Sequence, residues 1–177
     1  MHLRLERWAS PISALMLVTD DADILRALYF GDRDEQLRRV LHQHYGKYRL
    51  TEGRTADAIK KPLEAYFEGN LGAIDAIPVA TGGTPFQQDV WRALRSIPAG
   101  TTTTYGQIAS TLGRDGSSRA VGAANGANPI AIVIPCHRVV GANGTLTGYG
   151  GGLANKRWLL AHEARHSPVL AGAIGSL

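Results

Sequence analysis

The sequence predicts an α/β protein in which a domain with an antiparallel sheet and helices is followed by a mainly helical domain that contains a helix-turn-helix. Three observations support this fold class. Short apolar-rich runs separated by Ser, Pro, Asp and Gly occupy the start of the chain. Residues at helical spacing follow these runs. Helix-start signals and glycine-containing turns then dominate the second half.

The N-terminal half begins with three expected strands. An antiparallel meander is predicted by three apolar-rich runs, at residues 2–8, 12–19 and 24–30. Two helices should follow, because helical spacing recurs in two sets: Leu37, Val40, Leu41 and His44, then Ile59, Leu63, Tyr66 and Phe67. The stretch from Pro78 to Pro85, which contains residues 81–84, breaks both periodicities. We therefore expect an N-terminal domain over 1–80, a linker over 81–84 and a second domain over 85–177.

The second domain opens with a strong helix-start signal. Thr84 can cap a helix that has Pro85 at its first position, and Gln87 three residues on completes a capping box. Apolar residues on one face continue this helix until Pro98 stops it.

A second capping box predicts the helix-turn-helix. Thr104 and Gln107 repeat the cap and start a short helix that ends at Gly113. After a tight link, another helix begins near Ser117. Helix, short glycine-containing turn and helix is the pattern of many DNA-binding domains.

Charge is divided unevenly between the halves. The chain carries a net charge of +4 at pH 7, but residues 1–80 hold 11 Lys and Arg against 12 Asp and Glu, whereas residues 81–177 hold 8 against 3. The basic half suits a polyanion such as a nucleic acid, and a solvated basic surface is the alternative. The start of the chain does not resemble a signal peptide, and no apolar run approaches about 20 residues. We therefore expect a cytoplasmic protein with no membrane partner.

Cys136 is the only cysteine in the chain, so it has no partner for a disulfide or a thiolate metal cluster. It lies in the run I-P-C-H-R-V at 134–139, where a proline fixes the backbone and His137 and Arg138 follow the thiol. This setting favours a reactive nucleophile. The alternative for a lone cysteine is a buried thiol that acts as a small hydrophobe.

The second helix of the expected helix-turn-helix is rich in small residues. A helix that reads base edges in the major groove needs Arg, Lys, Asn or Gln at several positions. This one offers Gly122, Ala123, Ala124, Gly126 and Ala127. Small side chains permit close approach to a minor groove with little sequence readout, and close packing between helices is the alternative. Arg119 is the long cationic side chain on this face.

These motifs together resemble the O6-alkylguanine-DNA alkyltransferases, also called methylated-DNA-protein-cysteine methyltransferases. Besides the run at 134–139, the resemblance covers Thr84, Pro85 and Phe86, then Arg119, Ala120, Val121 and Gly122, then Asn128 and Pro129, the run 147–151, and Leu159, Leu160, Ala161, His162 and Glu163. The matches stand in family order across half of the chain.

The resemblance implies a DNA repair enzyme. It would flip O6-alkylguanine out of double-stranded DNA and transfer the alkyl group irreversibly to Cys136, once per molecule. By the same resemblance, His137 takes the thiol proton through a bridging water and Glu163 holds His137 in the required tautomer. Tyr105 hydrogen-bonds the guanine and supplies the leaving-group proton. Asn128 ties the recognition helix to the cysteine loop.

The resemblance also implies a DNA-binding face and a substrate pocket. Arg119 would enter the base stack in place of the flipped nucleotide, and the other expected DNA-binding residues are Thr104, Ser117, Ala120, Gly122 and Ala123. The expected pocket residues are Ala131, Val139, Tyr149 and Gly150, with the carbonyls of Cys136 and Val139 and the N–H of Gly150 reading the base. No cofactor is implied. Cooperative self-association on DNA stays open.

Two positions depart from some relatives. Ala131 stands where a proline packs on large adducts, and Gly150 stands where a serine can occur. These departures leave the implied catalytic set intact, but they put in doubt how well bulky adducts are held.

Two other functions would use some of the same residues. His162, Glu163 and His166 fit the zinc-protease pattern H-E-x-x-H, but none of the 11 residues after His166 is His, Asp or Glu, so the usual third ligand is missing and we expect no metal site. A DNA-binding regulator whose thiol senses alkylation would use the same helix-turn-helix. With no second cysteine and no recognisable regulatory domain, repair is the favoured function.

Overall fold

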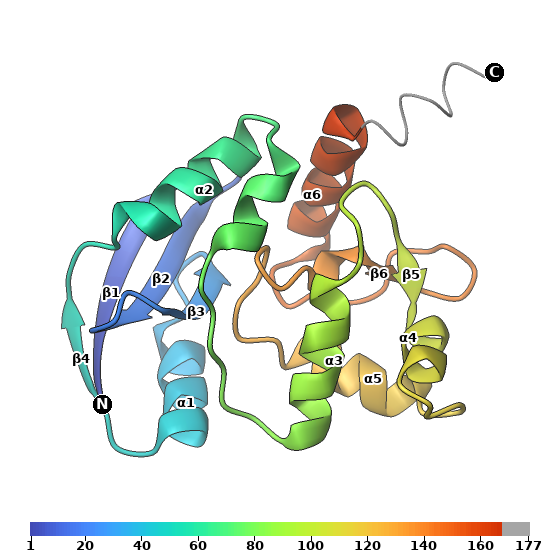
Figure 1. Cartoon of the computed structure of the whole chain (residues 1–177), viewed down its shortest axis with the longest axis horizontal. Coiled ribbons are helices and arrows are strands. Elements are labelled where there is room, and N and C mark those ends of the chain that lie inside the picture. Colours follow the sequence, from blue (N-terminus) through green and yellow to red (C-terminus); the bar gives the residue numbers. More distant parts are fainter. Residues whose placement is uncertain (168–177) are drawn as a thin grey trace.

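The computed structural model describes residues 1–167, which form a four-stranded mixed sheet beside a group of helices (Figure 1). The N-terminal elements are β1 (His2–Ala9), β2 (Ala14–Asp20), β3 (Leu25–Phe30), α1 (Asp34–Tyr45), β4 (Arg49–Glu52), α2 (Asp57–Phe67) and the 3-10 helix η1 (Leu71–Ala76). The C-terminal elements are α3 (Pro85–Arg95), β5 (Thr103–Thr104), α4 (Tyr105–Thr111), α5 (Ser118–Gly126), the 3-10 helix η2 (Cys136–Arg138), β6 (Val139–Val140) and α6 (Leu153–His166).

The predicted antiparallel meander is confirmed, and the sheet has one strand more than expected. Strands lie in the order β3-β2-β1-β4, with antiparallel pairing of β1 to β2 and of β2 to β3. The additional strand, β4, pairs with β1 in parallel. This strand has no clear sequence signal, because three of its four residues are exposed and the run R-L-T-E does not alternate apolar and polar residues.

The two faces of the sheet are covered by different elements. Side chains of α1 pack on one face against alternate residues of β1, β2 and β3. The opposite face packs against α2 and against the helices of the C-terminal half. Both predicted helices of the N-terminal half therefore form, and each buries its apolar stripe on its own side of the sheet.

Both predicted capping boxes are present. The Thr84 hydroxyl accepts from the N–H of Gln87 at 3.1 Å, and the Gln87 side chain accepts from the N–H of Thr84 at 3.0 Å. Thr104 and Gln107 make the same reciprocal pair at the start of α4. The short turn between α4 and α5 completes the expected helix-turn-helix, with Ser117 as the residue before α5.

The N- and C-terminal halves are joined through one hydrophobic cluster and through the edge of the sheet. The cluster contains Leu17 and Phe30 of the sheet together with Val90 and Trp91 of α3. At the edge strand β3, the N–H of Leu28 donates to the carbonyl of Pro129 at 2.9 Å. The division at 81–84 stays a prediction. No helix within residues 1–167 has the length and hydropathy that crossing a membrane requires.

Candidate active site

The segment that leads to Cys136 is fixed by Asn128. The Asn128 Nδ2 donates to the carbonyl of Ile134 at 2.7 Å, and its Oδ1 accepts from the N–H of Ile130 at 3.0 Å. Between these contacts Ile132 has a φ of 69°, which for a β-branched residue carries strain of roughly 1–3 kcal/mol. Because Ile132 is fully buried, its packing holds this conformation, and the segment delivers Cys136 to η2 in one orientation.

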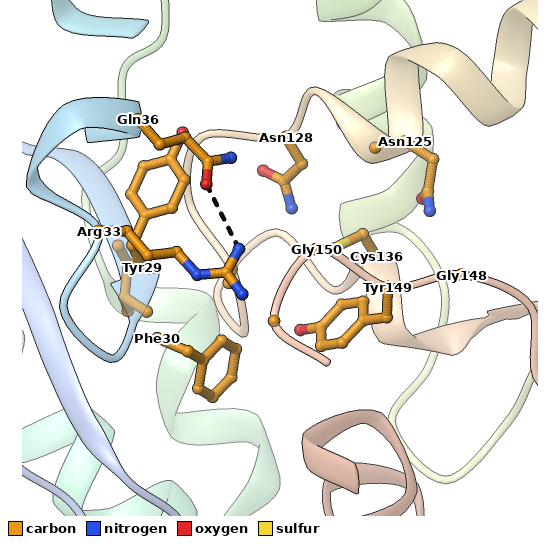
Figure 2. Close-up of a pocket in the computed structure, with 14 residues that line it drawn as sticks. Tyr29, Phe30, Arg33, Gln36, Asn125, Asn128, Cys136, Gly148, Tyr149 and Gly150 are labelled. Carbon is orange, nitrogen blue, oxygen red and sulfur yellow. Dashed lines mark hydrogen bonds between the residues drawn. The ribbon is translucent and has the colours of Figure 1, made fainter. Parts of the chain in front are cut away.

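A cavity lies beside Cys136, between the two halves of the molecule (Figure 2). The C-terminal half contributes Asn125, Gly126, Asn128, Ala131, Cys136 and the run 148–151. The N-terminal half contributes Leu28, Tyr29, Phe30, Arg33 and Gln36. Three of the expected pocket residues, Ala131, Tyr149 and Gly150, line this cavity. Val139 does not, and its carbonyl accepts from the Lys156 Nζ at 2.6 Å.

The carboxylate of Glu163 is fully buried and is bound from several directions. Its Oε1 accepts from the His137 Nε2 at 2.7 Å, from the Tyr66 hydroxyl at 2.8 Å and from the Arg138 Nη2 at 2.9 Å. Burial by itself raises the pKa of Glu163, but the adjacent His137 and Arg138 outweigh it and hold the pKa well below its usual range. Glu163 is therefore ionised at neutral pH.

The ionised carboxylate fixes the tautomer of His137. Burial lowers the pKa of His137 against the opposing influence of Glu163, so the ring is neutral at neutral pH. Because the Nε2 atom faces a carboxylate that can only accept, Nε2 carries the proton and Nδ1 carries the lone pair. The Nδ1 atom is buried without a hydrogen-bond partner within residues 1–167. His137 thus offers one basic nitrogen, in the residue next to Cys136.

Cys136 is nearly buried, with 6% of its surface exposed. Burial raises the pKa of its thiol, while the neighbouring Asn128 and Tyr149 side chains and the positive charge of Lys156 act in the opposite direction. Arg138, which follows His137 in the sequence, turns instead to Glu163 and to the carbonyl of Ile97, 2.7 Å away. The cation that acts on the thiol is therefore Lys156 and not Arg138.

The second helix of the helix-turn-helix, α5, has two distinct sides. Val121, Ala124 and Asn125 are buried, and the Trp91 Nε1 donates to the Ala124 carbonyl at 2.8 Å, which holds α5 against α3. The opposite side exposes Arg119, Ala120, Ala123 and Gly126. Both expectations for the small residues of α5 therefore hold in part. Some of them pack against the neighbouring helix, and others form an exposed, smooth face that a large partner could approach.

The remaining expected residues lie near this face. Gly122 is half-buried, and a Cβ there would lie 3.8 Å from the ring of Tyr105. Tyr105 does not line the cavity beside Cys136, and its hydroxyl shares a hydrogen bond of 2.9 Å with Thr147, which precedes the cavity residue Tyr149 in the same loop. Thr104 and Ser117 are half-buried at the starts of α4 and α5.

Besides other residues of the cavity wall, three residues with polar or charged side chains were not predicted for this site. Tyr66 was expected only as part of an apolar helix face, yet its hydroxyl reaches Glu163. Lys156 is fully buried in α6, and Arg33 comes from the N-terminal half. None of them belongs to a local motif. Only the proximity of segments far apart in the sequence identifies them.

The H-E-x-x-H residues are engaged in other contacts. The His162 Nε2 donates to the carbonyl of Tyr66 at 2.7 Å, and the His166 Nδ1 donates to the carbonyl of His162 at 2.8 Å. Glu163 faces His137 and Arg138. Within residues 1–167, no three His, Cys, Asp or Glu side chains gather as a metal site would require.

Comparisons with known proteins agree on one family. Residues 85–165 match the family model described as the DNA-binding domain of 6-O-methylguanine DNA methyltransferase. The chain is 51% identical over 166 residues to the methylated-DNA-protein-cysteine methyltransferase of Salmonella typhimurium, a match that covers 92% of this chain and 96% of the relative. The protein of the same name from Mycobacterium bovis is 56% identical over 135 residues, a match that covers 74% of this chain and 81% of the relative.

Solved structures give the same result. The OGT protein of Mycobacterium tuberculosis, determined in complex with DNA, matches with a TM-score of 0.76 at 39% identity, over 97% of this chain and 98% of that one. The O6-methylguanine-DNA methyltransferase of Pyrococcus kodakaraensis matches with a TM-score of 0.70 at 27% identity, over 91% and 98%.

The arrangement around Glu163 predicts a single protonation state for His137. We expect a neutral ring at neutral pH with its proton on Nε2, because burial disfavours the imidazolium and the carboxylate requires a donor. Nitrogen-15 chemical shifts of labelled histidine would measure this, and the spectrum of His137→Asn would assign the signal. In Glu163→Gln the fixed tautomer should be lost. A doubly protonated ring in the wild-type protein at neutral pH would contradict the arrangement.

Proposed function

The chain belongs to the methylated-DNA-protein-cysteine methyltransferases, a family of DNA repair alkyltransferases, and we propose that it transfers the alkyl group of O6-alkylguanine in double-stranded DNA to its own Cys136, once per molecule. The observation that carries this proposal is the chain of contacts Tyr66, Glu163 and His137, which leaves a basic nitrogen on the residue that follows Cys136 in the sequence. That thiol faces a cavity beside α5.

Activation of the thiol is the first step. At rest the raised pKa keeps Cys136 protonated. We propose that the His137 Nδ1 takes this proton through a bridging water, which makes a thiolate next to an imidazolium. Glu163 stabilises the imidazolium through the Nε2–H, and Lys156 stabilises the thiolate. Burial lowers the pKa of Lys156 and the charge of Cys136 raises it, so the thiolate and the ammonium favour each other.

Alkyl transfer is a direct displacement. The Sγ lone pair forms a bond to the alkyl carbon, the bond from that carbon to O6 breaks, and its electron pair returns to the guanine, which takes up one proton. Tyr105 is the proposed donor of that proton; for this its hydroxyl must leave Thr147 and turn toward the cavity, which it does not line in this structure. Asn128 is proposed to hold the cysteine loop against α5 during the step. The product is a thioether with no leaving group, so the reaction stops after one turnover.

Binding of DNA is proposed to use the exposed side of α5. A relative was solved in complex with DNA, and Ala120 and Ala123 leave a surface that can approach a minor groove closely. Arg119 lies at the start of this helix and is exposed, as a side chain that fills a vacancy in the base stack must be. Thr104, Ser117 and Gly122 are proposed as nearby contacts. Cooperative self-association on DNA stays open.

The test of the proposed function is the mass of the intact protein after incubation with duplex DNA that contains O6-methylguanine. One methyl equivalent should appear, located on Cys136 by peptide mapping, and added substrate should give no more. The Cys136→Ser variant, which removes only the thiolate, should bind the same DNA and gain no methyl group. Transfer by that variant, or more than one equivalent per molecule, would overturn the proposal.

Arg119 should matter only where a base must be flipped. In Arg119→Ala the transfer rate on a duplex lesion should fall much more than the rate on free O6-methylguanine, because the free base needs no vacancy stabilised. Arg157→Ala is the matched control, since it removes another exposed arginine, from α6. Equal losses on both substrates would assign a structural role to Arg119.

Tyr66 should act on the reaction through Glu163. Tyr66→Phe keeps the buried ring and removes one hydrogen bond to an ionised carboxylate, so we expect a loss of about 1.5–3 kcal/mol in the free energy of unfolding. The transfer rate should fall by up to about 10-fold. The rates on duplex and free base should fall alike while DNA affinity stays unchanged. Tyr45→Phe is the control, because the Tyr45 hydroxyl donates to the carbonyl of Ala80, away from the cavity. A wild-type rate in Tyr66→Phe would limit the role of Tyr66 to packing.

A further inference from the structure

Arg33 brings a guanidinium from the N-terminal half to the cavity of Cys136. It is the residue before α1, and its side chain lines the cavity together with Gln36. The Arg33 Nη1 donates to the Gln36 Oε1 at 3.3 Å. Figure 2 shows the guanidinium extending from the α1 side toward the loop that carries Tyr149 and Gly150. A positive charge is therefore held over the space that the proposed function assigns to the substrate.

This charge is not neutralised by a neighbouring carboxylate. Among the ion pairs formed within residues 1–167, none includes Arg33. The nearest acidic residue in α1, Asp34, binds Arg7 at 2.7 Å. The guanidinium therefore keeps most of its donors for another partner, and an Arg fork suits anionic oxygens such as carboxylate or phosphate.

Arg33 and Cys136 line the same cavity and influence the same residue in its wall. Tyr29 lies in the cavity wall, and its pKa is raised to about 12, mainly by burial. The charge of Arg33 acts to lower this pKa, and the charge of Cys136 acts to raise it. Both groups thus lie within electrostatic range of the same phenol. Another residue of the cavity wall, Asn125, is 5% exposed, and its Oδ1 has no hydrogen-bond partner in the described part of the chain. A wall of this kind suits a polar ligand.

The turn that carries Arg33 is held against the C-terminal half. The ring of Phe30 packs edge-on against Tyr149 with centroids 6.1 Å apart. A Cβ at Gly151 would come within 2.5 Å of that ring, so only glycine permits this approach. Since β3 is also bonded to Pro129, Arg33 follows a strand that is fixed to the C-terminal half, which places its backbone at the edge of the cavity.

We propose that Arg33 is a specificity-determining residue that binds an anionic oxygen group of the substrate in the cavity. The group is either a carboxylate at the end of the alkyl adduct or a phosphate next to the flipped nucleotide. This proposal rests on the proposed function and adds a preference within it. Ala131 and Gly150 line the cavity with the smallest side chains, and a Cβ at Gly150 would meet no atom within 4 Å, which leaves room for an adduct longer than methyl.

The carboxylate case can be written as a balanced step. With O6-carboxymethylguanine, the Cys136 thiolate bonds to the methylene carbon, the bond from that carbon to O6 breaks, and guanine takes up a proton. The product is S-carboxymethylcysteine, whose carboxylate stays in the cavity beside Arg33. In the phosphate case the same bonds change, but the anion belongs to the DNA backbone and leaves with it.

Single-turnover rates on four substrates would distinguish the two cases. The substrates are O6-methylguanine and O6-carboxymethylguanine, each in duplex DNA and as the free base, and the variants are Arg33→Gln, Arg33→Lys and, as control, the exposed Arg39→Gln on α1. If the anion is the adduct carboxylate, Arg33→Gln lowers the rate on both carboxymethyl substrates by at least about 10-fold and spares the methyl ones. If it is a phosphate, Arg33→Gln lowers the rate on both duplexes and spares both free bases.

The remaining outcomes oppose the proposal. Four unchanged rates in Arg33→Gln, or four rates lowered equally, would show that Arg33 binds no anionic group of the substrate. A supporting result also requires partial rescue by Arg33→Lys, which keeps the charge and loses the fork. Failure of the wild-type protein to act on O6-methylguanine in duplex DNA would instead refute the proposed function itself.

Discussion

The buried carboxylate of Glu163 is the constraint on which the arrangement of the site depends. An isolated carboxylate is costly to bury, so the structure must supply donors from every direction. It does so from α2 through Tyr66, from η2 through His137 and Arg138, and from the backbone N–H of Gly100. Because these donors come from elements far apart in the sequence, the position of each element is fixed relative to α6. Removing one donor would weaken more than one local contact.

The N-terminal half takes part in this site in two ways. The Tyr66 hydroxyl donates a hydrogen bond to Glu163, and the end of β3 forms one wall of the cavity beside Cys136. The hydrogen bond from Leu28 to Pro129 also attaches the sheet to the segment in which Ile132 is strained. Strain of this kind persists only where the surrounding structure holds it. The sheet therefore supports the backbone that presents the nucleophile, in addition to covering the hydrophobic cluster.

Local signals predicted most of the fold, and long-range contacts explain what was missed. The helix starts at Thr84 and Thr104 could be predicted from the sequence, because a capping box involves only four consecutive residues. The roles of Tyr66 and Lys156 depend instead on segments separated by up to 97 positions. Tyr66 has the spacing of a core residue, and in a sequence Lys156 looks like any surface lysine. Arg138 was misplaced for the same reason: adjacency to Cys136 in the chain suggested contact, whereas the backbone of η2 turns its guanidinium toward Glu163.

Resting and reacting states of the proposed mechanism differ by the position of one proton. At rest the thiol and His137 are neutral between the negative Glu163 and the positive Lys156 and Arg138. Moving the proton from Cys136 to His137 creates a negative and a positive charge while the total charge of the cluster stays the same. The new imidazolium lies against Glu163, and the new thiolate lies within range of Lys156. The charges of Glu163 and Lys156 therefore stabilise both products of the proton transfer. Burial keeps the resting thiol protonated, but these charges offset its effect when the proton moves to His137.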